Sequence, residues 1–98
     1  QRVVPRSLLR ESTTRMNLAA TLAQLGRYDD GEREAQAALA ALQDELGPAH
    51  PQIASAYATL ALVSDYRGDN KAAIERGERA LALMKDARLD EHPTGLTI

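Results

Sequence analysis

Two histidines and Ser12, one of four serines, are the residues first considered for chemistry in this chain. A neutral imidazole binds metals or transfers protons, and a serine hydroxyl is a nucleophile when a base activates it. His50 and His92 each precede a proline and are 42 residues apart. If that spacing is a helical repeat, the two imidazoles lie in successive layers roughly 10 Å apart and do not share a metal. We expect each to hydrogen-bond a helix start or a nearby carbonyl.

No catalytic motif accompanies these residues. The sequence has no nucleophile elbow, P-loop, HExxH motif or glycine-rich phosphate loop. No spacing pairs Ser12 with His50 and an acid. We therefore predict a protein that is not an enzyme, with no catalytic residue, no metal site and no cofactor.

Composition narrows the remaining classes of function. The formal charge of −2 provides none of the basic excess that nucleic acid binding requires. The absence of cysteine excludes disulfides and thiolate metal sites. No apolar run approaches the roughly 20 residues of a membrane span, and the N-terminus lacks a signal-peptide segment. We expect a soluble, cytoplasmic protein without nucleic acid or membrane partners.

The distance between the two His-Pro pairs is also a period of the whole chain. An offset of 42 aligns Leu18 and Ala19 with Leu60 and Ala61, Gly26 with Gly68, and Ala38, Leu39 and Ala40 with Ala80, Leu81 and Ala82. A fixed period with matches along its length marks a repeat architecture. We predict one domain, residues 1–98. It would hold repeat one at about 8–49, repeat two at about 50–91 and, as in a longer array, the start of a further repeat at 92–98.

Apolar periodicity and helix breakers divide each repeat into two helices. Gly26 and Gly68 can take the left-handed conformation that ends a helix, and Gly47 and Pro48 interrupt another. Pro51 suits a first helical turn, where its missing N–H would be unpaired anyway. These signals predict helices that end near Gly26, Leu46, Arg67 and Arg88, with Asp29 and Asp30 at the start of the second and Asp69 or Asn70 as the cap of the last. Alanine and leucine dominate the apolar positions, without Phe or Trp, so the fold class is all-α.

Two segments resemble the tetratricopeptide repeat family. "NLAATLAQLGRYDDGEREAQAAL" (17–39) and "TLALVSDYRGDNKAAIERGERAL" (59–81) are similar to its order of Leu-Ala, Gly-x-Tyr, Ala and Ala-Leu. The 42-residue period and the "LGPAHP" linker are closer to the kinesin-light-chain-like subclass. The resemblance covers about residues 7–93. It implies antiparallel helix pairs stacked as a short right-handed α-solenoid of about four helices, with a concave groove that binds peptides or protein segments along the first helix of each pair.

Two glycines depart from the family pattern. Gly31 occupies a position that is usually alanine, and Gly77 one that is usually larger. Each costs about 1 kcal/mol of helix propensity relative to alanine. The charged run Glu75, Arg76, Glu78 and Arg79 is assigned to the convex surface, and it includes an i,i+4 pair of opposite charge between Glu75 and Arg79.

One side of each first helix would line the groove. If the helix of repeat one packs on its neighbour through the stem of Arg15 and through Leu18, Ala19 and Leu22, a different side remains free. That side and its equivalent one period later form what we call the groove face: Thr13, Asn17, Ala20, Gln24, Ser55, Thr59, Leu62 and Tyr66. Its amides and hydroxyls can bond a peptide backbone, and Leu62 and Tyr66 can receive a side chain. Asn17 also matches the Asn before Leu-Ala that contacts the ligand backbone in kinesin-light-chain-like repeats.

Two functions remain open at this point. The first is a non-catalytic interaction module, part of a larger signalling or scaffold protein, that binds an extended peptide or partner segment at the groove face. The second is a structural module that stacks on neighbouring repeats or on another copy as a homo-oligomer. The second rests on Ile74, Leu81 and Met84, which would leave an apolar side of the last helix uncovered.

Overall fold

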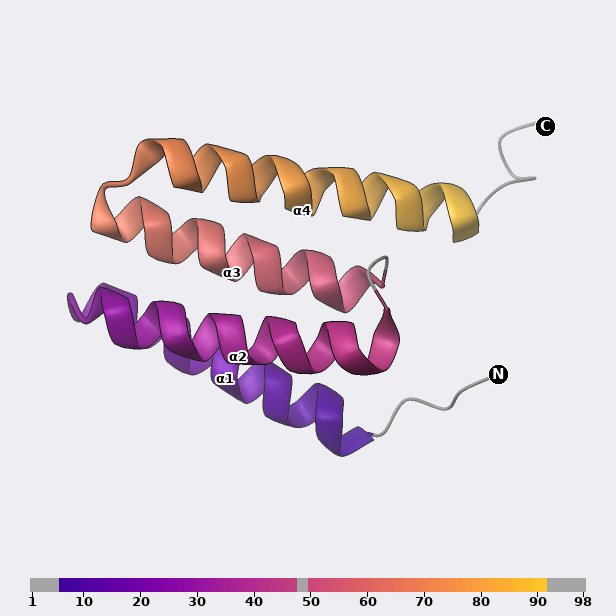
Figure 1. Ribbon diagram of the computed structural model, residues 1–98, viewed down its shortest axis with the longest axis horizontal. Helices are drawn as coiled ribbons and strands as arrows, with labels where there is room; N and C mark the ends of the chain where they lie inside the picture. The colour runs from indigo at the N-terminus through magenta and orange to yellow at the C-terminus, as the bar shows by residue number, and fades with distance from the viewer. Residues whose placement is uncertain (1–5, 48–49, 92–98) are drawn as a thin grey trace.

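The computed structural model describes residues 6–47 and 50–91, with side chains over 6–47 and 50–85, and these residues form four α-helices and no strand. The helices are α1 (Arg6–Gln24), α2 (Tyr28–Leu46), α3 (Pro51–Arg67) and α4 (Asn70–Glu91). Neighbouring helices run antiparallel, with α2, α3 and α4 side by side and α1 behind α2 (Figure 1). The predicted all-α fold of stacked helix pairs is confirmed.

The predicted helix ends are confirmed at Leu46 and Arg67. The first helix ends slightly earlier than expected, at Gln24, and the last continues beyond Arg88 to Glu91. Gly68 has a φ of 89° and its N–H donates to the carbonyl of Asp65 at 3.1 Å, which closes α3 in the left-handed conformation.

Two side chains cap the starts of the later helices. The Nδ1 atom of His50 accepts a hydrogen bond from the N–H of Gln52 at 3.1 Å, so the expected structural role of this histidine is confirmed. Asp69 caps α4, because its Oδ1 accepts from the N–H of Ala72 at 3.1 Å. His92 lies outside the described residues.

The core is built mainly from small and medium aliphatic side chains. Its largest fully buried members are Leu42, Ile53, Leu60 and Val63. Alanines surround them, so the helices approach closely and one cluster runs through the stack. This buried cluster consists of Met16, Ala19, Ala23, Ala35, Ala38, Leu39, Leu42, Ile53, Ala54, Ala56, Leu60, Val63 and Leu83.

The two unusual glycines have different surroundings. A Cβ atom on Gly31 would lie 2.8 Å from the carbonyl oxygen of Ala19 on α1, closer than side chains tolerate. Gly31 therefore permits the close crossing of α1 and α2. A Cβ on Gly77 would meet nothing within 4 Å, and nothing in the structure explains that glycine.

The predicted packing side of α1 is wrong for Leu18. Leu18 is 44% exposed, whereas its equivalent Leu60 is 1% exposed. The reason is the number of neighbours: α3 packs against α1, α2 and α4, while α1 packs against α2 and α3 within the described residues. The side of α1 that corresponds to the α2-facing side of α3 is thus open. The buried residues of α1 are Ser12, Met16, Ala19 and Ala23.

Candidate functional site

The groove face is distributed over α1 and α3, which pack directly against each other. Ala20 and Thr59 are partly buried. The other six side chains are exposed: Thr13, Asn17 and Gln24 on α1, and Ser55, Leu62 and Tyr66 on α3. All eight predicted residues therefore keep some solvent access, on two helices that touch.

Five polar side chains of the groove face have no hydrogen-bond partner within the described part of the chain. They are the amides of Asn17 and Gln24 and the hydroxyls of Thr13, Ser55 and Tyr66. The hydroxyl of Thr59, in contrast, donates to the carbonyl of Ser55 at 3.0 Å. Asn17 and Gln24 can each donate and accept, which is what the backbone of an extended peptide requires.

The groove face contains no aspartate, glutamate, lysine or arginine. Its chemistry is therefore that of amides, hydroxyls, one leucine and one tyrosine ring. Such a surface can hydrogen-bond a backbone and bury apolar side chains, but it offers no fixed charge to pair with a charged ligand group.

A second cluster, centred on Arg76 of α4, was not predicted. The guanidinium contacts the carboxylate of Glu32 on α2 through Nη2–Oε2 at 2.6 Å and Nη1–Oε1 at 3.0 Å. The same Nη1 donates to the hydroxyl of Ser64 on α3 at 2.7 Å. Arg76 belongs to the charged run assigned to the convex surface, and its side chain is mostly buried in this three-helix junction.

The junction changes the acidity of its carboxylate. The hydrogen bond from Arg76 lowers the pKa of Glu32 below its ordinary value, against the opposing effect of burial. No sequence signal could have found this pair, because 44 residues separate the partners and no motif relates them. Nearby, the guanidinium of Arg79 lies 5.8 Å from the ring centre of Tyr57.

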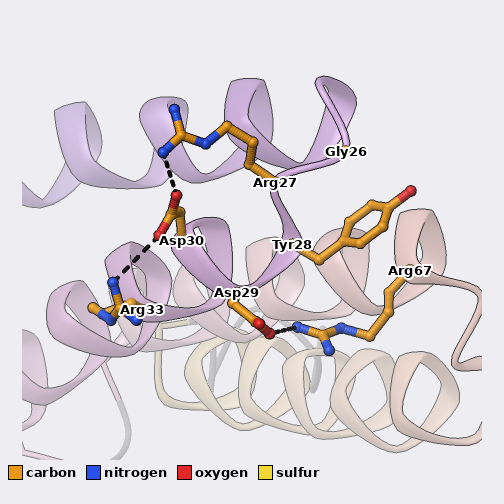
Figure 2. A pocket seen from close by; sticks show the side chains of 7 residues that line it. All are labelled: Gly26, Arg27, Tyr28, Asp29, Asp30, Arg33 and Arg67. Carbon is orange, nitrogen blue, oxygen red and sulfur yellow. Dashed lines mark hydrogen bonds and ion pairs between the residues drawn. The ribbon is translucent and has the colours of Figure 1, made fainter.

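A shallow depression of about 450 Å³ lies at the turn between α1 and α2. Figure 2 shows its lining and the ion pairs across it: Arg67 to Asp29 at 2.8 Å, and Asp30 to Arg27 at 2.6 Å and to Arg33 at 3.3 Å. The hydrogen bond that Arg67 donates to Asp29 raises the pKa of Arg67. Each of the three arginines has a carboxylate partner, but Arg27 and Arg33 share Asp30, so the ion-pair cluster has one more arginine than it has carboxylates.

The residues predicted for self-association lie on α4. Ile74, Leu81 and Met84 are all exposed, at spacings of seven and three that place them on one side of the helix. We call these three residues the outer α4 face. Large apolar side chains grouped in this way are typical of contact surfaces.

The described segments contain neither a membrane-spanning helix nor a cluster of metal ligands. Over 6–47 and 50–91, none of the helices has both the length and the apolar character needed to cross a bilayer. Over the same segments, no three His, Cys, Asp or Glu side chains gather so that they could hold a metal ion.

Comparison with known proteins gives one match. The model of a family described as tetratricopeptide repeat matches residues 10–86, most of the chain. No curated protein and no solved structure matches it significantly.

Proposed function

This chain belongs to the tetratricopeptide repeat family, and we propose that it is a non-catalytic module that binds an extended peptide or partner segment at the groove face. Repeats of this family generally mediate protein–protein interaction. The single observation that carries the proposal is the exposed, unpartnered amide of Asn17 on α1, on a helix that packs against the one bearing Tyr66.

The chemistry of the groove face defines the proposed ligand. Asn17 and Gln24 bond backbone N–H and C=O groups of an extended segment, while Leu62 and Tyr66 hold one apolar side chain. Because the face has no charged residue, the ligand is uncharged where it touches the groove. Selectivity then depends on shape and on backbone hydrogen bonds.

The same proposal includes the subclass of the repeats, their boundaries and the shape of the stack. We place the chain in the kinesin-light-chain-like subclass, with repeats at about 8–49 and 50–91, a right-handed stack and a concave groove. The 42-residue period and the "LGPAHP" linker support this subclass. A cytoplasmic location within a larger signalling or scaffold protein is the setting that such a module fits.

The test is selection of binders from a displayed library of random short peptides. Asn17→Ala should weaken the selected peptides about fivefold, which corresponds to one lost hydrogen bond. Tyr66→Ala should weaken them roughly thirtyfold, because an aromatic anchor is removed. Gln36→Ala, an exposed change on α2, is the matched control and should leave binding intact. Equal binding by all three variants would contradict the groove as the site.

A second candidate function is structural self-association through the outer α4 face. It is favoured by the exposure of Ile74, Leu81 and Met84, more than half exposed on average. Under this function, a charged residue in place of Leu81 or Met84 dissociates homo-oligomers, whereas Asn17→Ala has no effect on them. Light scattering behind size exclusion separates the two functions.

A further inference from the structure

Equivalent positions of α2 and α4 differ in burial. Leu39 is 7% exposed and its equivalent Leu81 is 55% exposed; Leu42 is 0% exposed and its equivalent Met84 is 49% exposed. The α2 helix packs against α1 and α3, while α4 packs against α3 within the described residues. The outer α4 face therefore corresponds to the side of α2 that α3 covers.

Helix α1 shows the complementary difference with α3. Its open side carries Thr14, Leu18, Thr21 and Leu25, all exposed, which we call the outer α1 face. The equivalents of the first three, on the α2-facing side of α3, are Ala56, Leu60 and Val63, each at most 1% exposed. Within the described residues, one end of the stack thus leaves open the side of α4 that corresponds to the α3-facing side of α2. The other end leaves open the side of α1 that corresponds to the α2-facing side of α3 (Figure 1).

The existing α2–α3 contact supplies the register in which these ends would meet. Across it, Asp29 pairs with Arg67 at 2.8 Å. One period away, the corresponding residues are Lys71 on α4 and Leu25 on α1. The methylene stem of Lys71 can then cover Leu25, with its ammonium group in water.

A second pair of positions follows from the Arg76 junction. Glu32 on α2 and Ser64 on α3 bind the same guanidinium nitrogen, so they are close neighbours across the α2–α3 contact. Their equivalents are Ile74 on α4 and Leu22 on α1. A polar contact inside the chain is therefore matched by an apolar one between the ends.

From this continuity with the internal interface we infer that the outer α4 face binds the outer α1 face of a second copy of this chain, head to tail. The α4 half of the inference rests on the second candidate function above; the α1 half, the register and the polarity go beyond it. The occupant is a copy of the chain, because this register places Leu22 of α1 against Ile74 of α4 and Leu25 of α1 against Lys71 of α4.

The polar residues of the outer α1 face are compatible with burial. The hydroxyl of Thr14 donates to the carbonyl of Arg10 at 2.9 Å, and that of Thr21 to the carbonyl of Asn17 at 3.1 Å. Both donors are satisfied within α1 and lose nothing when water leaves. Glu11, the equivalent of buried Ile53, falls toward the end of α4 that carries Lys85, which provides the opposite charge.

A head-to-tail contact leaves one free face at each end of every complex. Such heterologous association forms open chains of copies unless it closes into a ring. The average mass should therefore rise continuously with concentration, without a plateau at the dimer. An isologous α4–α4 contact would instead stop at two copies.

Complementation between end-blocked variants tests the inference. The α4-blocked variant carries Leu81→Glu and Met84→Glu, and the α1-blocked variant carries Leu18→Glu and Leu25→Glu; all four positions are exposed. Each variant alone should be monomeric, with the dissociation constant raised at least about tenfold per lost leucine contact. Their equimolar mixture should give a dimer and nothing larger, because one intact junction remains. Ala82→Glu, an exposed change on α4, should still form longer chains.

Two results would overturn the inference. Dimerisation of the α1-blocked variant alone would show an isologous α4 contact, and a wild-type protein that is monomeric up to about 1 mM, with no mixed dimer, would show no contact. Circular dichroism of each variant checks that it is folded.

Crosslinking provides an independent test of register, because the chain contains no cysteine. A short bismaleimide should join Lys71→Cys to Leu25→Cys in a mixture, and should not join either to Ala40→Cys, which is exposed on α2. Absence of the mixed crosslink would contradict the register. Peptide binding is measured separately on the α4-blocked monomer, so that failure of the groove proposal and failure of this inference are distinguishable.

Discussion

Arg76 of α4 holds Glu32 of α2 through two nitrogen–oxygen contacts, at 2.6 and 3.0 Å, although α2 and α4 do not pack against each other in the described residues. The guanidinium crosses α3 to reach its partner and bonds Ser64 on the way, at 2.7 Å. One side chain thereby joins both helix pairs.

Removal of this side chain should destabilise the stack. Arg76→Ala leaves Ser64 without its donor and Glu32 with only the 3.3 Å hydrogen bond from Gln36, in a partly buried place. We therefore expect the free energy of unfolding to fall by about 2 kcal/mol. Arg33→Ala removes an exposed ion pair with Asp30 and should cost less than about 0.5 kcal/mol. Urea denaturation measures both. Similar losses for the two variants would contradict a special role of the junction.

The stabilisation by Glu32 should depend on pH. Its folded-state pKa is lowered by the hydrogen bond from Arg76, so the ionised form stabilises the fold above the ordinary glutamate pKa of about 4.3. This contribution is lost as pH falls through that value and through the lowered folded-state pKa. The difference in unfolding free energy between wild type and Glu32→Gln should therefore shrink in acid. A difference that stays constant between about pH 7 and pH 3 would be inconsistent with this coupling.

The two helical glycines should respond to alanine with opposite signs. Gly31→Ala places a Cβ 2.8 Å from the carbonyl oxygen of Ala19 and should destabilise by about 2 kcal/mol, because backbone must move. Gly77→Ala meets nothing within 4 Å and should stabilise by about 1 kcal/mol through helix propensity. Thermal unfolding of both variants measures these changes in stability. Stabilisation by Gly31→Ala would contradict the close crossing of α1 and α2.

Peptide binding at the groove face should be nearly independent of salt. No charged residue belongs to this face, so raising NaCl from about 0.05 M to about 0.5 M should change the dissociation constant less than about twofold. Calorimetry with a selected peptide provides the constants. A tenfold loss over that range would redirect attention to the ion-pair cluster of Figure 2, around Asp29 and Arg67.

The sequence predicts the fold well because local signals determine it. Apolar periodicity, Pro51 and Gly68 are read within single helices, and the structure confirms the helices they predict. The cap at Asp69 is of the same kind, since the side chain and the N–H it binds are three residues apart.

The sequence fails to predict the burial of a residue where that burial depends on a neighbouring helix. The period aligns Leu18 with Leu60, but only Leu60 has α2 against that side, so equal residues differ in exposure. The partner of Arg76 lies 44 residues away and two helices distant, beyond any local pattern. For the groove face, the sequence predicts which side of each helix is free, and binding itself remains a prediction.

The most direct test of the proposed function is amide NMR of the ¹⁵N-labelled protein titrated with a library-selected peptide, using the α4-blocked monomer. The proposal predicts that the largest shifts fall on α1 between Thr13 and Gln24 and on α3 between Ser55 and Tyr66, with α2 little affected. Shifts concentrated on the turn from Gly26 to Asp30 or along α4 would contradict a groove-binding role.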